Sequence, residues 1–85
     1  MARPVQVDLM DDLAYQVHDF LLKEAVPFNG GYVVFIPVTE LAKHFQRNHR
    51  TITRRLFALK DAKLLGPLIQ KTYGTLYWVK EEEED

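Results

Sequence analysis

The sequence predicts a small α+β fold, with three helices and three short strands in the order helix, strand, helix, helix, strand, strand. Apolar residues recur at helical spacing over residues 8–22 and 39–62, with one break near residue 47. Residues 32–36 form a short run of β-branched and aromatic residues, and residues 68–71 and 75–79 are two further strand-like runs. A chain of 85 residues can bury one small core. We therefore expect a single domain over residues 1–80, followed by a disordered acidic tail over residues 81–85.

The first helix is expected to begin at Asp8, whose carboxylate can cap the free N–H groups of the first turn. Its apolar stripe is typical of a helix packed on a core and consists of Leu9, Met10, Leu13, Ala14, Val17, Phe20 and Leu21. Pro27 ends the helix, and residues 28–31 form a turn. The stripe's edge holds Tyr15, His18 and Leu22, which either seat a second subunit or belong to an ordinary amphipathic helix.

The three strand-like runs are expected to form a small antiparallel sheet. The first follows a Gly-Gly pair, and the other two flank residues 72–74 as a hairpin. Along the last run, Leu76 and Trp78 face one way while Tyr77 and Val79 face the other.

The two middle helices lie close together in the sequence. Thr39 is expected to cap the first of them and Asn48 the second. The second helix buries a narrow seam at spacings of four, three and four residues, formed by Ile52, Leu56, Leu59 and Lys63.

The opposite face of this second helix carries arginines. At about 100° per residue, Arg47, Arg50 and Arg54 fall together with Thr51, away from the apolar seam. Arginine can donate two parallel hydrogen bonds to guanine, and threonine can contact a thymine methyl group or a phosphate. The alternative is a solvated helix face, since arginine usually lies at the surface.

Charge is unevenly distributed along the chain, although the net charge is only −1. Residues 1–37 carry a net charge of −3, residues 38–80 carry +7, and residues 81–85 carry −5. A basic segment between acidic ones indicates a nucleic-acid partner better than the total charge does.

Several kinds of chemistry are excluded or disfavoured. The chain has no cysteine and no serine, so it has no disulfide, no thiolate ligand and no Ser or Cys nucleophile. Three histidines without an H-E-x-x-H pattern give no reason to expect a metal, and no nucleotide-binding fingerprint is present. We expect a non-enzyme with no cofactor, metal or small-molecule ligand. No apolar run approaches the roughly 20 residues of a membrane span, so we expect a cytoplasmic, nucleoid-associated protein without a membrane partner.

The stretch IPVTELAKHFQRNHRTITRRLFALKDAKLL, followed by LIQKTYGTLYWV, resembles winged helix-turn-helix DNA-binding domains. These include the domains of MarR-like and other small bacterial, archaeal and phage regulators, and the resemblance covers residues 8–80. It implies a supporting helix over 39–45, a recognition helix over 48–62 and a wing over 68–79. It further implies a homodimeric transcriptional regulator that binds double-stranded DNA and acts by occupying its site. The alternative is a winged-helix module that binds another protein within a larger assembly.

Carried over residue by residue, the resemblance assigns base reading to Arg50, Thr51 and Arg54, with Arg47 and His49 beside them. It assigns phosphate contacts to Thr39, Lys43 and Thr53. The wing contributes Lys71, Thr72, Tyr73 and Thr75, of which Tyr73 is equally explained as a turn residue lying over the hairpin.

The chain departs from the family pattern at two places. Gln46-Arg47 stands where the family often has glycine and an aliphatic residue. Arg55 stands where a small residue is common, and we assign it to an ion pair with the acidic first helix or to a phosphate. Phe57 and Trp78 are assigned to packing, although Phe57 lies on the outer side of its helix, where a partner chain could cover it.

Overall fold

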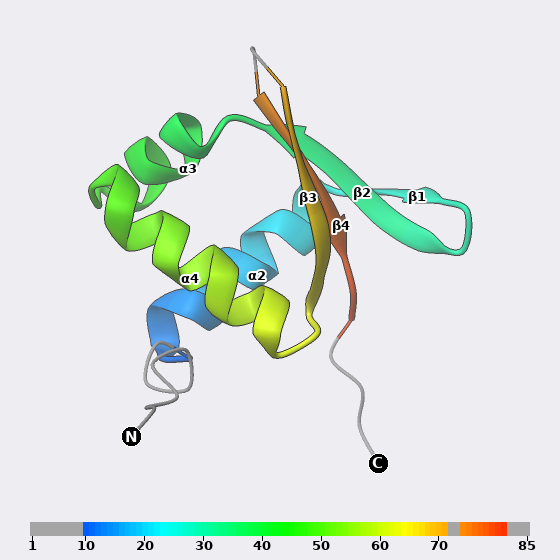
Figure 1. The fold of residues 1–85 in the computed structure, drawn as a ribbon, viewed down its shortest axis with the longest axis horizontal. Helices are drawn as coiled ribbons and strands as arrows, with labels where there is room; N and C mark the ends of the chain where they lie inside the picture. The colour runs from blue at the N-terminus through cyan, green and yellow to red at the C-terminus, as the bar shows by residue number, and fades with distance from the viewer. Residues whose placement is uncertain (1–9, 72–73, 82–85) are drawn as a thin grey trace.

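The computed structural model describes residues 10–71 and 74–81. Along these residues run three helices and four strands, shown in Figure 1: α2 (Asp12–Glu24), β1 (Val26–Phe28), β2 (Gly31–Ile36), α3 (Val38–Phe45), α4 (His49–Asp61), β3 (Leu65–Lys71) and β4 (Gly74–Val79). The strands form one antiparallel sheet in the order β1-β2-β4-β3. The prediction of an α+β fold with three helices is therefore confirmed, whereas the prediction of three strands is wrong.

The additional strand is β1, which pairs with β2 through a two-residue turn. Asn29 and Gly30 both have positive φ angles, 50° and 80°, as a type I′ hairpin turn requires. The sequence pattern predicts only a helix end at Pro27, and no strand before the turn. Proline lacks a backbone N–H, but an edge strand can accept it because one side of that strand makes no ladder hydrogen bonds.

Helix α2 begins later than expected. Asp11 is the N-cap, and its Oδ1 accepts a 3.1 Å hydrogen bond from the N–H of Ala14. Asp8, the expected cap, lies outside the described residues. At the other end, the residue before Pro27 disfavours helical backbone. The helix therefore stops at Glu24, and Ala25 is its C-cap.

Helices α3 and α4 are joined by three residues, and their caps differ from one another. Asn48 caps α4 as predicted, since its Oδ1 accepts a 2.8 Å hydrogen bond from the N–H of Thr51. Thr39 does not cap α3. The helix begins one residue earlier because the carbonyl of Pro37 accepts from the N–H groups of Glu40 and Leu41.

The connection between these helices turns at Gln46, whose φ of 56° and ψ of 45° are left-handed. The N–H of Arg47 then donates 3.0 Å to the carbonyl of Ala42, which closes the end of α3. Only glycine adopts this conformation without steric cost, so the tight turn forms here at some expense of stability.

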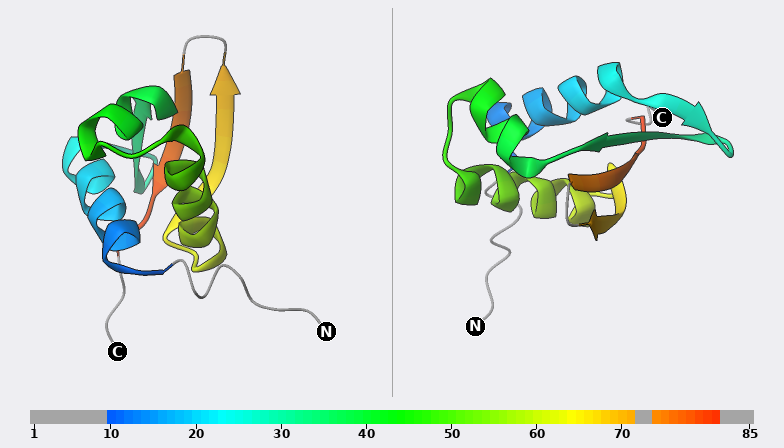
Figure 2. Two further views of the ribbon diagram at one scale, coloured as in Figure 1. Left: turned by 90° about the vertical axis from the view of Figure 1, so that its left-hand side faces the viewer. Right: turned by 90° about the horizontal axis from the view of Figure 1, so that it is seen from above.

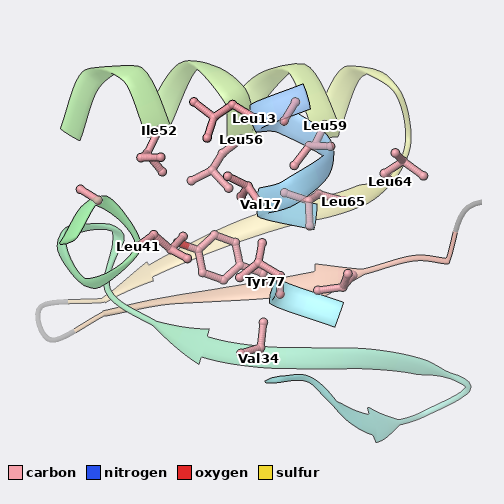
Figure 3. Close-up of a cluster of buried hydrophobic side chains, with 14 residues drawn as sticks. Leu13, Val17, Val34, Leu41, Ile52, Leu56, Leu59, Leu64, Leu65 and Tyr77 are labelled. Atoms are coloured by element: carbon pink, nitrogen blue, oxygen red, sulfur yellow. The ribbon is translucent and has the colours of Figure 1, made fainter. Parts of the chain in front are cut away.

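The core lies between the helices and one face of the sheet (Figure 3). Its largest fully buried side chains are Val17, Leu21, Leu41, Ile52, Leu56, Leu59, Tyr77 and Val79. The predicted alternation along β4 is confirmed, because Tyr77 and Val79 point into this core. Lys63 is not part of the seam of α4. It is exposed and has a φ of 66°, since α4 has already ended at Asp61.

Figures 1 and 2 show the helices grouped on one side of the sheet, while the β1–β2 hairpin extends away from them. His18, expected at the edge of α2, is buried. Its Nε2 lies 2.6 Å from the carbonyl oxygen of Lys80 and donates to it, so His18 fastens α2 to the end of β4. His18 therefore cannot seat a second subunit.

Candidate nucleic-acid interface

The exposed side of α4 carries two arginines one helical turn apart. Arg50 and Arg54 are both exposed, and residues four apart lie on the same face of a helix. Ile52, Leu56 and Leu59 are fully buried on the opposite side and hold α4 against the core. Packing of this seam therefore fixes the direction in which the two guanidinium groups face solvent.

Arg55 is held differently from its neighbours. Its Nη2 donates 2.7 Å to Oδ2 of Asp11, and its Nε lies 3.4 Å from Oδ1 of the same carboxylate. The hydrogen bond from Arg55 lowers the pKa of Asp11 below its ordinary value, and the N–H of Ala14 adds to this effect. The predicted ion pair between Arg55 and the acidic first helix is confirmed. Within the described part of the chain, Arg55 is the only arginine of α4 that forms an ion pair, which leaves Arg50 and Arg54 available.

The first turn of α4 is ordered by local contacts. Asn48 caps it, and Oγ1 of Thr53 lies 3.4 Å from Nδ1 of His49 across one turn. His49 is exposed, whereas Thr51 and Thr53 are partly buried at the two edges of the exposed face. Arg47 is exposed just before the cap. The structure therefore brings the predicted residues around the N-terminal half of α4 together.

Two further predicted residues lie on the neighbouring helix. Thr39 and Lys43 are one turn apart on α3, and both are exposed. The described ends of the β3–β4 hairpin, Lys71 and Gly74, lie at the same end of the fold as α3 (Figures 1 and 3). Thr72 and Tyr73 lie outside the described residues, so their predicted wing contacts stay predictions. Thr75 is buried, which contradicts a DNA contact by its side chain.

Phe57 belongs to this surface, although the sequence reading assigned it to packing. Its side chain is 48% exposed, and it follows Arg50 and Arg54 at spacings of seven and three residues. An aromatic ring within a basic helix face can contact a thymine methyl group or an apolar pocket on a protein. The helical spacing in the sequence already indicates this position, because it places Phe57 on the same face as the arginines.

Other kinds of site find no support in the described structure. Over residues 10–71 and 74–81, no three His, Cys, Asp or Glu side chains gather to hold a metal ion. His44 instead stacks on Phe20, with ring centroids 4.2 Å apart. None of the helices in the same residues has the length and apolar character needed to span a membrane.

Comparisons with known proteins find no matching family model, no matching curated protein and no matching solved structure.

Proposed function

We propose that the protein binds double-stranded DNA sequence-specifically as a winged helix-turn-helix domain, with α4 in the major groove, and that it regulates transcription by occupying its site. One observation carries the proposal. Arg50 and Arg54 lie one turn apart on the exposed face of the N-terminal half of α4, and neither pairs with a described carboxylate. A recognition helix presents its N-terminal residues to base edges in this way.

The surroundings of α4 support this proposal. The left-handed turn at Gln46 sets α3 behind α4, and Thr39 and Lys43 on α3 are exposed where phosphates would lie. The β3–β4 hairpin corresponds to the wing, and it reaches the same end of the fold through Lys71. Residues 38–80 carry a net charge of +7, which supplies the long-range attraction to DNA.

A second candidate function is binding of another protein. Phe57, exposed among basic residues, favours it, because an aromatic anchor beside arginines suits a partner with an acidic rim around an apolar pocket. In this case α4 would contact a protein groove, and duplex DNA would bind weakly.

Equilibrium binding to a random-sequence duplex over a range of salt concentrations separates the two candidates. A protein that contacts about four phosphates shows a logarithmic salt slope of about −3 to −4. We expect the double variant Arg50→Ala/Arg54→Ala to bind more weakly and with a shallower slope than the wild type.

The matched control is Lys23→Ala, which removes an exposed cation from the last turn of α2. It should leave both affinity and slope unchanged. Absence of duplex binding at low salt would contradict DNA binding, and an equal loss in Lys23→Ala would show that only total charge matters.

A further inference from the structure

The face of the sheet that points away from the helices carries a patch of apolar side chains. Tyr77 and Val79 point into the core, so their neighbours along β4 point outward. Strand pairing places residues of the other three strands beside them. We define the outer apolar face as Val26, Val33, Phe35, Ile69, Leu76 and Trp78, together with Phe28 at its margin.

This face is exposed, although its sequence is typical of a covered one. Val26, Phe28, Phe35 and Ile69 are 40–57% exposed. Residues 32–36 and 76–79 are continuous apolar runs, which are typical of sheets covered on both faces. The helices cover one face only, as Figure 3 shows.

Trp78 lies near the middle of the outer apolar face and is partly buried. Its ring lies against Gly31, and the centroid of the Phe28 ring is 5.9 Å away. Beside it is an open hollow of about 660 Å³, whose lining includes Gly31, Gly66 and Lys80. A side chain from a partner can enter this hollow and contact the indole.

Both edges of the sheet disfavour extension by another strand. Pro27 stands in edge strand β1, while edge strand β3 contains Pro67 and a register shift between Leu65 and Leu68. Proline and strand irregularity are common means of blocking edge-to-edge pairing. A partner is therefore better placed against the face than along an edge.

The exposed area matches what a dimer needs. With about 150–250 Å² for each large side chain, the exposed fractions of Val26, Phe28, Phe35 and Ile69 add up to roughly 300–500 Å² per chain, and the partly buried Val33, Leu76 and Trp78 add to this area. Two copies then bury about 1,000 Å², which is the lower bound for a specific interface. In a two-fold dimer each patch meets itself, and the seven residues of the outer apolar face carry no charge that would repel its own copy.

We propose that the outer apolar face is a homodimer interface, in which a second copy of this chain packs sheet against sheet. Under the proposed function the dimer would bind two DNA half-sites, one with each copy. The interface itself rests on the sheet, which is on the other side of the fold from the arginines of α4. Its test therefore needs no DNA.

Sedimentation equilibrium of the DNA-free protein over a concentration series measures the association. We expect a species of twice the 9.9 kDa monomer mass. Trp78 is the only tryptophan, so its fluorescence should shift to shorter wavelength and become less accessible to acrylamide as the dimer forms. Val26→Glu and Ile69→Glu each place a carboxylate on the face, from opposite edges of the sheet. Each should raise the dissociation constant at least about tenfold.

Two matched controls place the same charge on exposed aromatic residues of the helices. Tyr15→Glu lies on α2, the other surface considered for pairing, and Phe57→Glu lies on α4. Both should dimerise as the wild type does. Circular dichroism and thermal unfolding establish whether each variant folds. If Val26→Glu does not fold, the dissociation constant of Ile69→Glu alone tests the interface.

A wild type that stays monomeric at about 1 mM would overturn the proposal. So would a dimer that dissociates in Tyr15→Glu or Phe57→Glu but persists in the two strand variants. A single-stranded oligonucleotide that quenches Trp78 fluorescence and competes with self-association would also overturn it, because the face would then bind nucleic acid. Loss of DNA binding in a protein that still dimerises would contradict the proposed function alone.

Discussion

Arg55 in the middle of α4 and Asp11 at the N-terminus of α2 form a bidentate ion pair between two helices far apart in the sequence. The same carboxylate also caps α2 through the N–H of Ala14. Asp11 therefore orients α4 against the first helix, and Arg55 acts in the structure of the protein while Arg50 and Arg54 face solvent.

The two roles of Asp11 can be separated by substitution. Asp11→Asn keeps an oxygen that can cap the helix and loses only the ion pair, so it should destabilise the fold by about 0.5–1 kcal/mol. Asp11→Ala loses both and should cost about 1–2 kcal/mol. Urea unfolding at neutral pH measures both values. An Asp11→Asn variant as stable as the wild type would show that the ion pair contributes nothing, and equal losses in the two variants would show that the cap contributes nothing.

The pH dependence of this pair has a defined sign. Because the folded state lowers the pKa of Asp11 from 3.8, the ion pair stabilises the fold above that value and is lost as the pH falls below it. The stability difference between wild type and Asp11→Asn should therefore shrink below about pH 4. A difference that stays constant down to pH 2 would contradict this assignment.

Ionisation of the buried Tyr77 should destabilise the fold at alkaline pH. Burial raises its pKa from 10.0 to about 12, partly offset by the nearby Thr75 side chain, while its hydroxyl has no well-formed hydrogen bond to the described residues. Because the folded state holds the Tyr77 hydroxyl neutral, this group leaves the free energy of unfolding unchanged below pH 10 and lowers it as the pH rises from 10 through about 12. Tyr77→Phe should remove this loss, and at pH 7 it should be neutral or stabilising by up to about 1 kcal/mol.

Tyr15→Phe is the control, since it alters an exposed ring and keeps Tyr77. Unfolding free energies measured from pH 8 to pH 11.5 should fall for wild type and Tyr15→Phe and stay flatter for Tyr77→Phe. A parallel fall in all three proteins would mean that Tyr77 does not titrate as proposed.

Gln46→Gly should stabilise the protein by about 0.5–1 kcal/mol, because glycine adopts the left-handed turn without steric cost. Part of the gain is offset by the greater freedom of glycine in the unfolded chain. The control, Gln16→Gly in the middle of α2, should destabilise by about 1 kcal/mol. Destabilisation by both variants, measured by urea unfolding, would mean that Gln46 makes contacts worth more than its strain.

Lys71 at the end of β3 tests the wing. If Lys71 contacts a phosphate, Lys71→Ala should weaken binding to all duplexes alike and reduce the logarithmic salt slope by about one unit. Filter binding over a salt series provides both numbers. An unchanged slope would place Lys71 away from DNA and leave the hairpin a structural role.

Helical periodicity was enough to predict much of this fold. It located α2, α3 and α4, and the amide of Asn48 marked the start of α4. The pairing of Arg55 followed from a charge near the buried edge of its helix. These features depend on local sequence, where propensity and packing agree.

Other features depend on contacts that local sequence does not encode. Strand β1 has only three residues, one of them Pro27, and exists because β2 pairs with it. The start of α3 at Val38 depends on the backbone of Pro37, which no side chain signals. The outer apolar face was hidden because an apolar run in a strand gives no sign of which face is covered.

Selection of bound fragments from a random duplex pool tests whether α4 reads DNA bases. The wild type should enrich one sequence motif, and the Arg50→Ala/Arg54→Ala variant should lose that enrichment while still retaining DNA at low salt, since each bidentate arginine discriminates bases by about 1–3 kcal/mol. A wild-type pool that stays random, or the same motif enriched by both proteins, would contradict base reading by α4.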